Sequence, residues 1–180
     1  MGRRVRVRFV TDDLHVTDDP GVTDEPDVTD DPDVTDDLAR PGDPELYDID
    51  ADPERVDLDV VWGWLSTEAY WSQWRTRQDV ETQVANAWRV VGAYRRSDGA
   101  MVGFARAISD GVSQAYLADV FVLPVARGLG LSKRILAEML EPAPGNRFRW
   151  SLHTRDAHGL YQQFGFAAPD QKYLERPATR

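Results

Sequence analysis

The spacing of apolar residues changes several times along the chain, and each spacing predicts a type of element. Alternating positions and short apolar runs are typical of strands, whereas apolar residues every three or four positions are typical of helices. Before residue 110 we expect a strand over 47–51, helices over 56–65 and 77–87, and strands over 89–94 and 101–108. Asp98-Gly99, between the last two strands, is a typical hairpin turn.

A nearly continuous apolar stretch, 114–123, contains AYLADVFVL and is typical of a buried central strand. Pro124 ends it, and apolar residues every four positions then predict a helix over 129–140. The last expected elements are a strand over 147–153, a helix over 156–164 that Gly165 ends, and a strand from Phe166 to about Leu174. This order of elements predicts an α+β domain with a mixed sheet.

Residues 9–38 repeat a unit of six residues, FVTDDL, HVTDDP, GVTDEP, DVTDDP and DVTDDL. Each unit offers little apolar surface beside several carboxylates, so burial cannot offset the chain entropy and we expect disorder. Weak calcium binding is the alternative, although the glycines of known calcium loops are absent. The segment 41–44, PGDP, marks the boundary between an acidic tail, 1–46, and a folded domain, 47–180.

The net charge of −10 belongs to that tail. Residues 1–46 hold 14 acidic side chains and 5 arginines, whereas 47–180 hold 17 acidic and 16 basic side chains. The nearly neutral domain argues against a nucleic-acid-binding face. No apolar run approaches the roughly 20 residues that span a bilayer, so we expect a cytoplasmic protein without a membrane partner. The sequence has no cysteine, which excludes disulfides and thiolate nucleophiles, and we expect no metal site.

The segment 127–133, RGLGLSK, joins the buried strand to the next helix. Helix N-termini carry unpaired N–H groups and partial positive charge, so they bind phosphate. Gly128 and Gly130 let the backbone approach a ligand closely, and basic side chains add charge at Arg127, Lys133 and Arg134. Walker A and dinucleotide fingerprints both fail here, because neither Gly-Lys-Ser/Thr nor a third glycine is present. A glycine turn that only caps a helix remains the alternative.

Residues 127–132 resemble motif A of the GNAT superfamily of N-acetyltransferases, Q/R-x-x-G-x-G/A, and the preceding ADVFVLP resembles its fourth strand. HTRDAHGLYQQFGF, residues 153–166, is similar to the superfamily's C-terminal motif. The resemblance covers about 47–176 and implies the GNAT fold, a mixed sheet flanked by helices with splayed central strands. It also implies an enzyme that moves an acetyl group from acetyl-CoA to a primary amine by direct attack in a ternary complex. A non-catalytic acyl-CoA sensor or scaffold is the alternative. Many relatives form homodimers.

The resemblance further implies where acetyl-CoA binds. The pantetheine arm enters between the splayed strands and pairs with the backbone of Val120, Phe121 and Val122. The side chains of Val120 and Phe121 are expected in the core. The pyrophosphate is expected on the N–H groups of Arg127, Gly128, Leu129, Gly130, Leu131, Ser132 and Lys133. Tyr161 matches the tyrosine that protonates the departing thiolate, and packing inside its helix is the alternative. Thr154 stands where many members have an asparagine that contacts the cofactor.

The acceptor side is less defined, because many superfamily members lack a dedicated base. Asp119 is either a buried base with a raised pKa or a carboxylate paired with an arginine. Glu68 is a second candidate base in an expected acceptor loop, against the alternative of a surface glutamate. His158 lies three residues before Tyr161 and is expected to bind the acceptor or to be structural. His153 is a further candidate base. An aromatic cluster is expected mainly in the core, with only Trp71 and Trp74 lining the pocket: Trp62, Trp64, Tyr70, Trp71 and Trp74.

Overall fold

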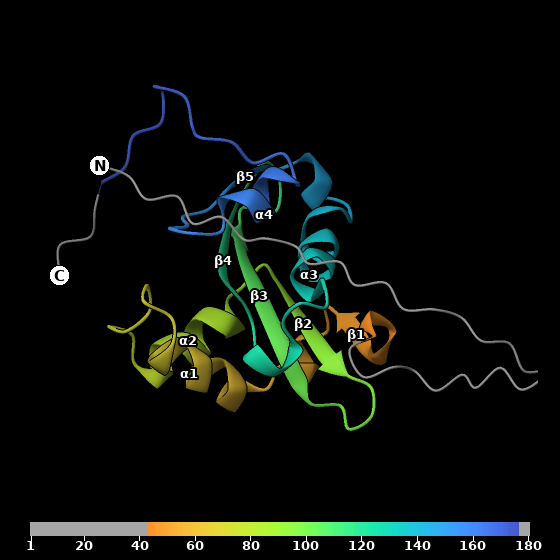
Figure 1. Cartoon of the computed structure of the whole chain (residues 1–180). Coiled ribbons are helices and arrows are strands. Elements are labelled where there is room, and N and C mark those ends of the chain that lie inside the picture. Colours follow the sequence, from red (N-terminus) through yellow and green to blue (C-terminus); the bar gives the residue numbers. More distant parts are fainter. Residues whose placement is uncertain (1–42, 177–180) are drawn as a thin grey trace, which may run out of the picture. The chain divides into compact units, whose positions relative to one another are not determined.

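The computed structural model describes residues 43–176, which contain one five-stranded sheet whose strand order follows the chain (Figure 1). The first four strands are antiparallel neighbours, and the fifth runs parallel to the fourth. The strands are β1 (Tyr47–Asp50), β2 (Arg89–Arg95), β3 (Met101–Ser109), β4 (Gln114–Val122) and β5 (Arg149–Ser151). The predicted α+β class with a mixed sheet is confirmed.

Two pairs of helices cover the two faces of the sheet. Figure 1 shows α1 and α2 on one side and α3 on the other. Residues of α3 and α4 share one apolar cluster with strand residues such as Val91 and Ala105, whereas α1 and α2 share a second cluster with their neighbours Val90 and Phe104. This alternation is the two-residue period of a strand. The helices are α1 (Leu58–Thr67), α2 (Arg77–Ala85), α3 (Leu131–Leu140) and α4 (His158–Gln162).

Side-chain caps set where the first two helices begin. The Asp57 carboxylate accepts hydrogen bonds from the N–H groups of Asp59 and Val60, so α1 begins at Leu58 rather than at the predicted Val56. Thr76 and Asp79 form a capping box at α2, which begins at Arg77 as predicted. The end of α1 at Thr67 and the start of α2 at Arg77 bound the segment that carries Tyr70, Trp71 and Trp74.

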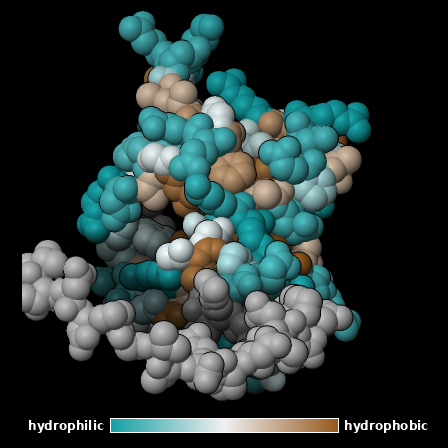
Figure 2. Space-filling model, turned by 45° about the vertical axis from the view of Figure 1, so that its right-hand side comes forward, coloured by the Kyte–Doolittle hydropathy of each residue, from teal (hydrophilic) through white to brown (hydrophobic). Residues whose placement is uncertain are grey.

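One predicted strand is wrong, and one predicted segment cannot be compared. No strand is present over 166–174 in the described part of the chain, where turns follow Gly165 and the side chains are mostly exposed. Pro169 lacks a backbone donor, and the polar residues after it have no apolar face to bury. The acidic repeat, 9–38, lies outside the described residues. On the face seen in Figure 2, apolar groups of the described part appear as small separate areas among hydrophilic ones.

β4 and β5 separate soon after they meet. They pair only at Gln114–Arg149, Ala115–Trp150 and Tyr116–Ser151. From Leu117 to Val122, β4 continues without a partner strand on that side within residues 43–176, while it stays paired with β3 on the other. The splayed central strands that the resemblance implied are therefore present, and they leave an open backbone edge beside a gap in the sheet.

Candidate functional site

The open edge of β4 leads, through the short 3-10 turn Pro124–Ala126, into a row of unpaired amides at the start of α3. The N–H groups of Gly128, Leu129, Gly130, Leu131 and Ser132 have no hydrogen-bond partner in the part of the chain that is described. The next two N–H groups, of Lys133 and Arg134, both bond to the Gly130 carbonyl, at 3.0 and 3.3 Å. Such a row at a helix N-terminus is suited to bind an anionic oxygen.

The two glycines of this row are required by backbone conformation. Gly128 and Gly130 have φ angles of 81° and 70°, in the left-handed region that strains other residues. A Cβ at either position would meet no atom within 4 Å, so the space in front of the row is open. The predicted close approach of a ligand to this backbone is therefore sterically possible.

The basic side chains around the row differ in their availability. Lys133 is exposed and makes no ion pair with the described residues. Arg127 donates from Nε to the Val122 carbonyl at 3.1 Å, and its guanidinium lies 5.3 Å from the Trp64 ring centre. Arg134 instead binds the carbonyls of Pro44 and Tyr47, so it anchors the chain before β1. These two bonds use Nη1 and Nη2 of Arg134, and its charge beside a bound anion stays a prediction.

A pocket of about 290 Å³ includes residues that border the gap between β4 and β5. It brings together five of the predicted site side chains, Tyr161, Asp119, His153, Trp71 and Trp74, and also Val120. Three stretches supply its lining, namely 70–83, 106–120 and 152–161. Glu68 and His158 are not among the lining residues.

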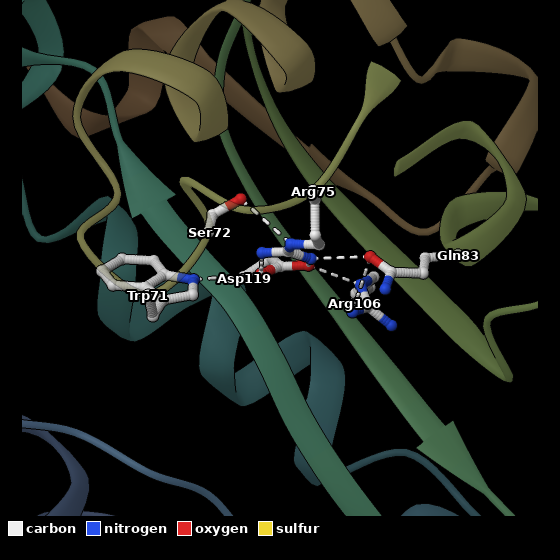
Figure 3. A network of polar contacts seen from close by, with 6 residues as sticks. All are labelled: Trp71, Ser72, Arg75, Gln83, Arg106 and Asp119. Carbon is white, nitrogen blue, oxygen red and sulfur yellow. Dashed lines mark hydrogen bonds and ion pairs between the residues drawn. The ribbon is translucent and has the colours of Figure 1, made fainter. Parts of the chain in front are cut away.

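Asp119 occupies a β-bulge, where the β3–β4 ladder shifts register and its own φ is 54°. Its carboxylate is buried and accepts four hydrogen bonds (Figure 3). Oδ1 accepts from Arg75 Nη2 at 2.7 Å and from Trp71 Nε1 at 3.1 Å, while Oδ2 accepts from Arg75 Nη1 at 2.9 Å and from Arg106 Nε at 2.6 Å. These bonds fill the acceptor positions of a carboxylate.

The charge environment decides between the two interpretations of Asp119. Burial raises the pKa of its carboxyl group, but the hydrogen bond from Arg75 and the charges of Arg106 and Arg75 outweigh burial, and the net pKa is lowered. The expectation of a base with a raised pKa is therefore wrong. The alternative, a carboxylate paired with arginine, is the arrangement found, and it leaves no free lone pair for a substrate proton.

Tyr161 presents a protonated hydroxyl to the pocket. It is 9% exposed on α4, and its ring meets that of Phe166 edge to face at 5.9 Å. Its hydroxyl has no hydrogen-bond partner among residues 43–176. Burial, together with the nearby Tyr70, Asp156 and Tyr116, raises the pKa of Tyr161 to about 12. The hydroxyl therefore stays protonated and neutral at ordinary pH.

A chain of three side chains runs from the pocket to solvent. The Tyr116 hydroxyl lies 2.9 Å from His153 Nδ1, and His153 Nε2 lies 3.2 Å from Glu175 Oε2. Glu175 can only accept at neutral pH, so Nε2 carries the proton and Nδ1 accepts from Tyr116. Burial raises the pKa of Tyr116 above its ordinary value. Both Tyr116 and His153 line the pocket.

Two predicted site residues lie away from the pocket. Glu68 is the exposed residue that ends α1, and its backbone N–H bonds to the Trp64 carbonyl. The predicted catalytic role of Glu68 is not supported, because its carboxylate does not line the cavity. His158 begins α4 and points to solvent although Tyr161, one turn later, is buried. The predicted acceptor-binding role of His158 is not supported, because its side chain does not line the pocket.

The aromatic cluster divides as expected. Trp62 and Trp64 pack against the apolar cluster of α1 and α2, with Trp64 stacked on Phe121 at 5.3 Å. Trp71 and Trp74 are 39% and 52% exposed and line the pocket. The side chain of Phe121 is buried and that of Val120 is partly buried in the apolar clusters, as predicted, and the side chain of Val122 is partly buried as well.

Sequence reasoning missed Arg75, Arg106, Gln83 and the pairing of Tyr116 with His153. For Arg106 a signal was present, because a charged residue inside the apolar strand GFARAI must find a partner when the strand is buried. Arg75, in an aromatic-rich loop, and Gln83, on the weakly amphipathic α2, carry no comparable signal.

Residues 43–176 contain no group of three or more His, Asp or Glu side chains placed to hold a metal ion. They also contain no helix whose length and apolar character suit it to cross a membrane.

Comparison with known proteins places this geometry in context. The family model described as "Acetyltransferase (GNAT) family" matches residues 44–166. A candidate acetyltransferase of Gibberella zeae is 32% identical over 129 residues, which cover 66% of this chain and 72% of that protein.

Solved structures give the same result. A candidate GNAT-family acetyltransferase from Xanthomonas campestris pv. campestris is 34% identical, with a TM-score of 0.67 over 73% of this chain and 93% of its own. A candidate acetyltransferase from Deinococcus radiodurans R1 is 22% identical, with a TM-score of 0.56 over 74% and 90% of the two chains, and it supports the fold alone.

Proposed function

Because this chain belongs to the acetyltransferase (GNAT) family and is an acyltransferase, we propose that it moves an acetyl group from acetyl-CoA to a primary amine by direct attack in a ternary complex. The observation that carries the proposal is the open edge of β4, which leads into the five unpaired N–H groups of residues 128–132. A strand edge binds amides, and a helix N-terminus binds phosphate. Acetyl-CoA offers both groups on one flexible molecule.

The donor site uses mainly backbone. The amides of the pantetheine arm pair with the free edge at Val120–Val122, where the side chains are committed to the core. The pyrophosphate takes the N–H groups from Gly128 to Ser132, and Lys133 adds a mobile positive charge beside it. With the donor bound in this way, its thioester lies near the pocket that Val120 and Tyr161 both line.

Tyr161 is the general acid of the proposal. When the amine nitrogen bonds to the acetyl carbon, the carbon–sulfur bond breaks and the thiolate needs a proton. The Tyr161 hydroxyl has no competing partner in the described structure and stays protonated, since burial raises its pKa to about 12. It supplies that proton to sulfur.

The pair Tyr116–His153 is the proposed route for the proton that the amine must lose. Asp119 has no free lone pair, and Glu68 lies outside the pocket. The Tyr116 hydroxyl accepts the amine proton as it passes its own to His153 Nδ1. Glu175 at Nε2 stabilises the resulting imidazolium, which then exchanges its proton with solvent.

The test has two parts. Calorimetry with coenzyme A is expected to give saturable binding, and a flat titration would remove the donor site. Thiol release from acetyl-CoA is then measured with a panel of primary amines and without any amine. Release that needs an amine supports the enzyme, whereas binding without release on every amine favours a sensor or scaffold.

The remaining parts of the proposal concern the surroundings of the enzyme. Four expectations stay predictions: a tail over 1–46 attached to an acetyltransferase domain over 47–180, a cytoplasmic location, a homodimer, and the absence of a nucleic-acid partner. Size-exclusion chromatography with light scattering checks the dimer directly.

A further inference from the structure

The buried network around Asp119 holds more positive than negative charge. The side chains of Arg75, Arg106 and Asp119 are 4%, 7% and 3% exposed. Guanidinium groups stay charged at any ordinary pH, and the pKa of the Asp119 carboxyl group is lowered, so all three are ionised. Two buried cations face one buried anion, and an unmatched buried charge is unfavourable unless a partner arrives.

The surplus positive charge can be assigned to one of the two arginines. Arg75 donates from Nη1 and Nη2 to the two oxygens of Asp119, from Nη1 to Gln83 Oε1 at 2.6 Å, and from Nε to Ser72 Oγ at 3.0 Å. Arg75 and Asp119 therefore form a matched, bidentate pair. Arg106 gives Asp119 only its Nε hydrogen and reaches Gln83 from Nη2 at a long 3.4 Å.

The free donors of Arg106 belong to the pocket. Its Nη1 has no partner within residues 43–176, and a terminal nitrogen points away from Asp119 and Gln83 in Figure 3. Within residues 43–176, Nη1 is not one of the fully buried polar atoms that lack a hydrogen-bond partner. Arg106 lines the pocket beside Trp71 and Trp74. A guanidinium with one end held by Asp119 and the other open is preorganised for a second anion.

No other group on the pocket wall neutralises this charge. Asp156, which also lines the pocket, is 71% exposed and lies 4.0 Å from Arg155. Glu175 is 53% exposed and bonds to His153. Tyr70, Tyr116 and Tyr161 are neutral lining groups. The anion that matches Arg106 must therefore come from the ligand.

We propose that the acceptor amine carries a carboxylate, which binds the free end of Arg106 inside the pocket. The inference rests on the proposed function, since it names the acceptor class of that same site. A carboxylate brings the single charge that the network lacks and matches the planar fork of arginine, whereas a phosphate group brings nearly two charges. The pocket of about 290 Å³ has room for a small acceptor of the amino-acid type, with Trp71 and Trp74 beside its apolar part.

Equilibrium binding tests the proposal without turnover. The probes are glycine, leucine and phenylalanine, each as the free acid, as the amide and as the decarboxylated amine, titrated in the presence of coenzyme A and followed by calorimetry. Within at least one set the acid is expected to bind on the order of 10²-fold more tightly than the amide, the scale of a charge-assisted hydrogen-bonded pair. Equal affinity for acid and amide in all three sets overturns the proposal.

Arg106→Met is the decisive variant, because it removes the surplus cation and leaves the Arg75–Asp119 pair matched. The ratio of acid to amide affinity is expected to fall to about one, by the same argument. Arg106→Lys keeps the charge without the fork and is expected to retain part of the preference. Arg95→Gln removes an exposed arginine of the β2–β3 turn and serves as the control that keeps the full ratio. An unchanged ratio in Arg106→Met assigns the preference to another group and also overturns the proposal.

The failure of this inference is distinguishable from failure of the proposed function. If thiol release occurs with neutral amines and shows no preference for acids, the proposed acetyltransferase function stands and the proposed acceptor carboxylate fails. If the acids bind more tightly than the amides but no amine gives thiol release, the proposed anion site stands and the proposed acetyl transfer fails.

Discussion

Arg75 and Asp119, which lie 44 residues apart in the sequence, form a bidentate ion pair with Nη2–Oδ1 and Nη1–Oδ2 distances of 2.7 and 2.9 Å. The pair ties the segment between α1 and α2 to the bulge of β4. The wall that carries Trp71 and Trp74 is thereby fixed to the strand whose open edge receives the donor in our proposal. In our proposal, stability and acceptor binding therefore depend on the same carboxylate.

Asp119→Asn is expected to lower the free energy of unfolding by about 3–5 kcal/mol, because it leaves two buried guanidinium groups without their anion. Urea denaturation followed by tryptophan fluorescence measures the change. Asp59→Asn breaks an exposed pair with Arg77 and is the matched control, with an expected change below about 1 kcal/mol. Equal effects of the two variants would contradict a buried ion network.

The same carboxyl group predicts an acid-sensitive component of stability. The pKa of Asp119 is lowered in the folded state, so its contribution is present above the unfolded pKa, near 3.8, and is lost as the pH falls through the folded value. Between pH 6 and pH 3 the wild type is therefore expected to lose more unfolding free energy than Asp119→Asn. Parallel pH curves for the two proteins would show that Asp119 does not contribute.

Tyr161→Phe removes the proposed acid and is expected to lower kcat by about 10²- to 10⁴-fold, with little change in coenzyme A affinity. Tyr173→Phe changes an exposed tyrosine and serves as the control. Because burial raises the pKa of Tyr161 to about 12, loss of its proton is not expected to limit kcat below pH 10. Unchanged turnover in Tyr161→Phe would remove the acid role.

Tyr116→Phe and His153→Gln interrupt the same proton route, so each is expected to lower kcat/KM by about 10²-fold or more. The double variant is expected to be little worse than either single variant, because residues that act as a unit are not additive. If the falls in kcat/KM of the two single variants multiply in the double variant, Tyr116 and His153 act independently and not along one proton route.

Gly130→Ala places a Cβ on a residue with φ of 70°, which costs about 1–2 kcal/mol. If the loop rearranges to relieve the strain, the row of N–H groups is lost and coenzyme A is expected to bind at least 10-fold more weakly by calorimetry. Gly63→Ala is the control of opposite sign, since Gly63 is an exposed residue of α1 with no neighbour for a new Cβ. Helix propensity makes that change stabilising by about 0.5–1 kcal/mol.

The sequence by itself determined what depends on near neighbours in the chain. The period of apolar residues located the four helices and five of the six predicted strands, and Asp98-Gly99 located the β2–β3 hairpin. The glycines at 128 and 130 marked the helix start whose N–H groups are unpaired. The failed strand, 166–174, had apolar residues too sparse to define a buried face, so local spacing was a weak guide there.

The tertiary structure alone decided which polar groups meet. Asp119 faces Arg75 and Arg106 because the bulge in β4 gives it a positive φ and shifts the register with β3. A one-residue change in register turns a side chain to the other face of a sheet, and no local spacing announces it. The same folding placed Tyr116 against His153 and moved Glu68 and His158 away from the pocket. Contacts between distant residues arise only when strands pair, so the chemistry of the acceptor wall was settled by packing.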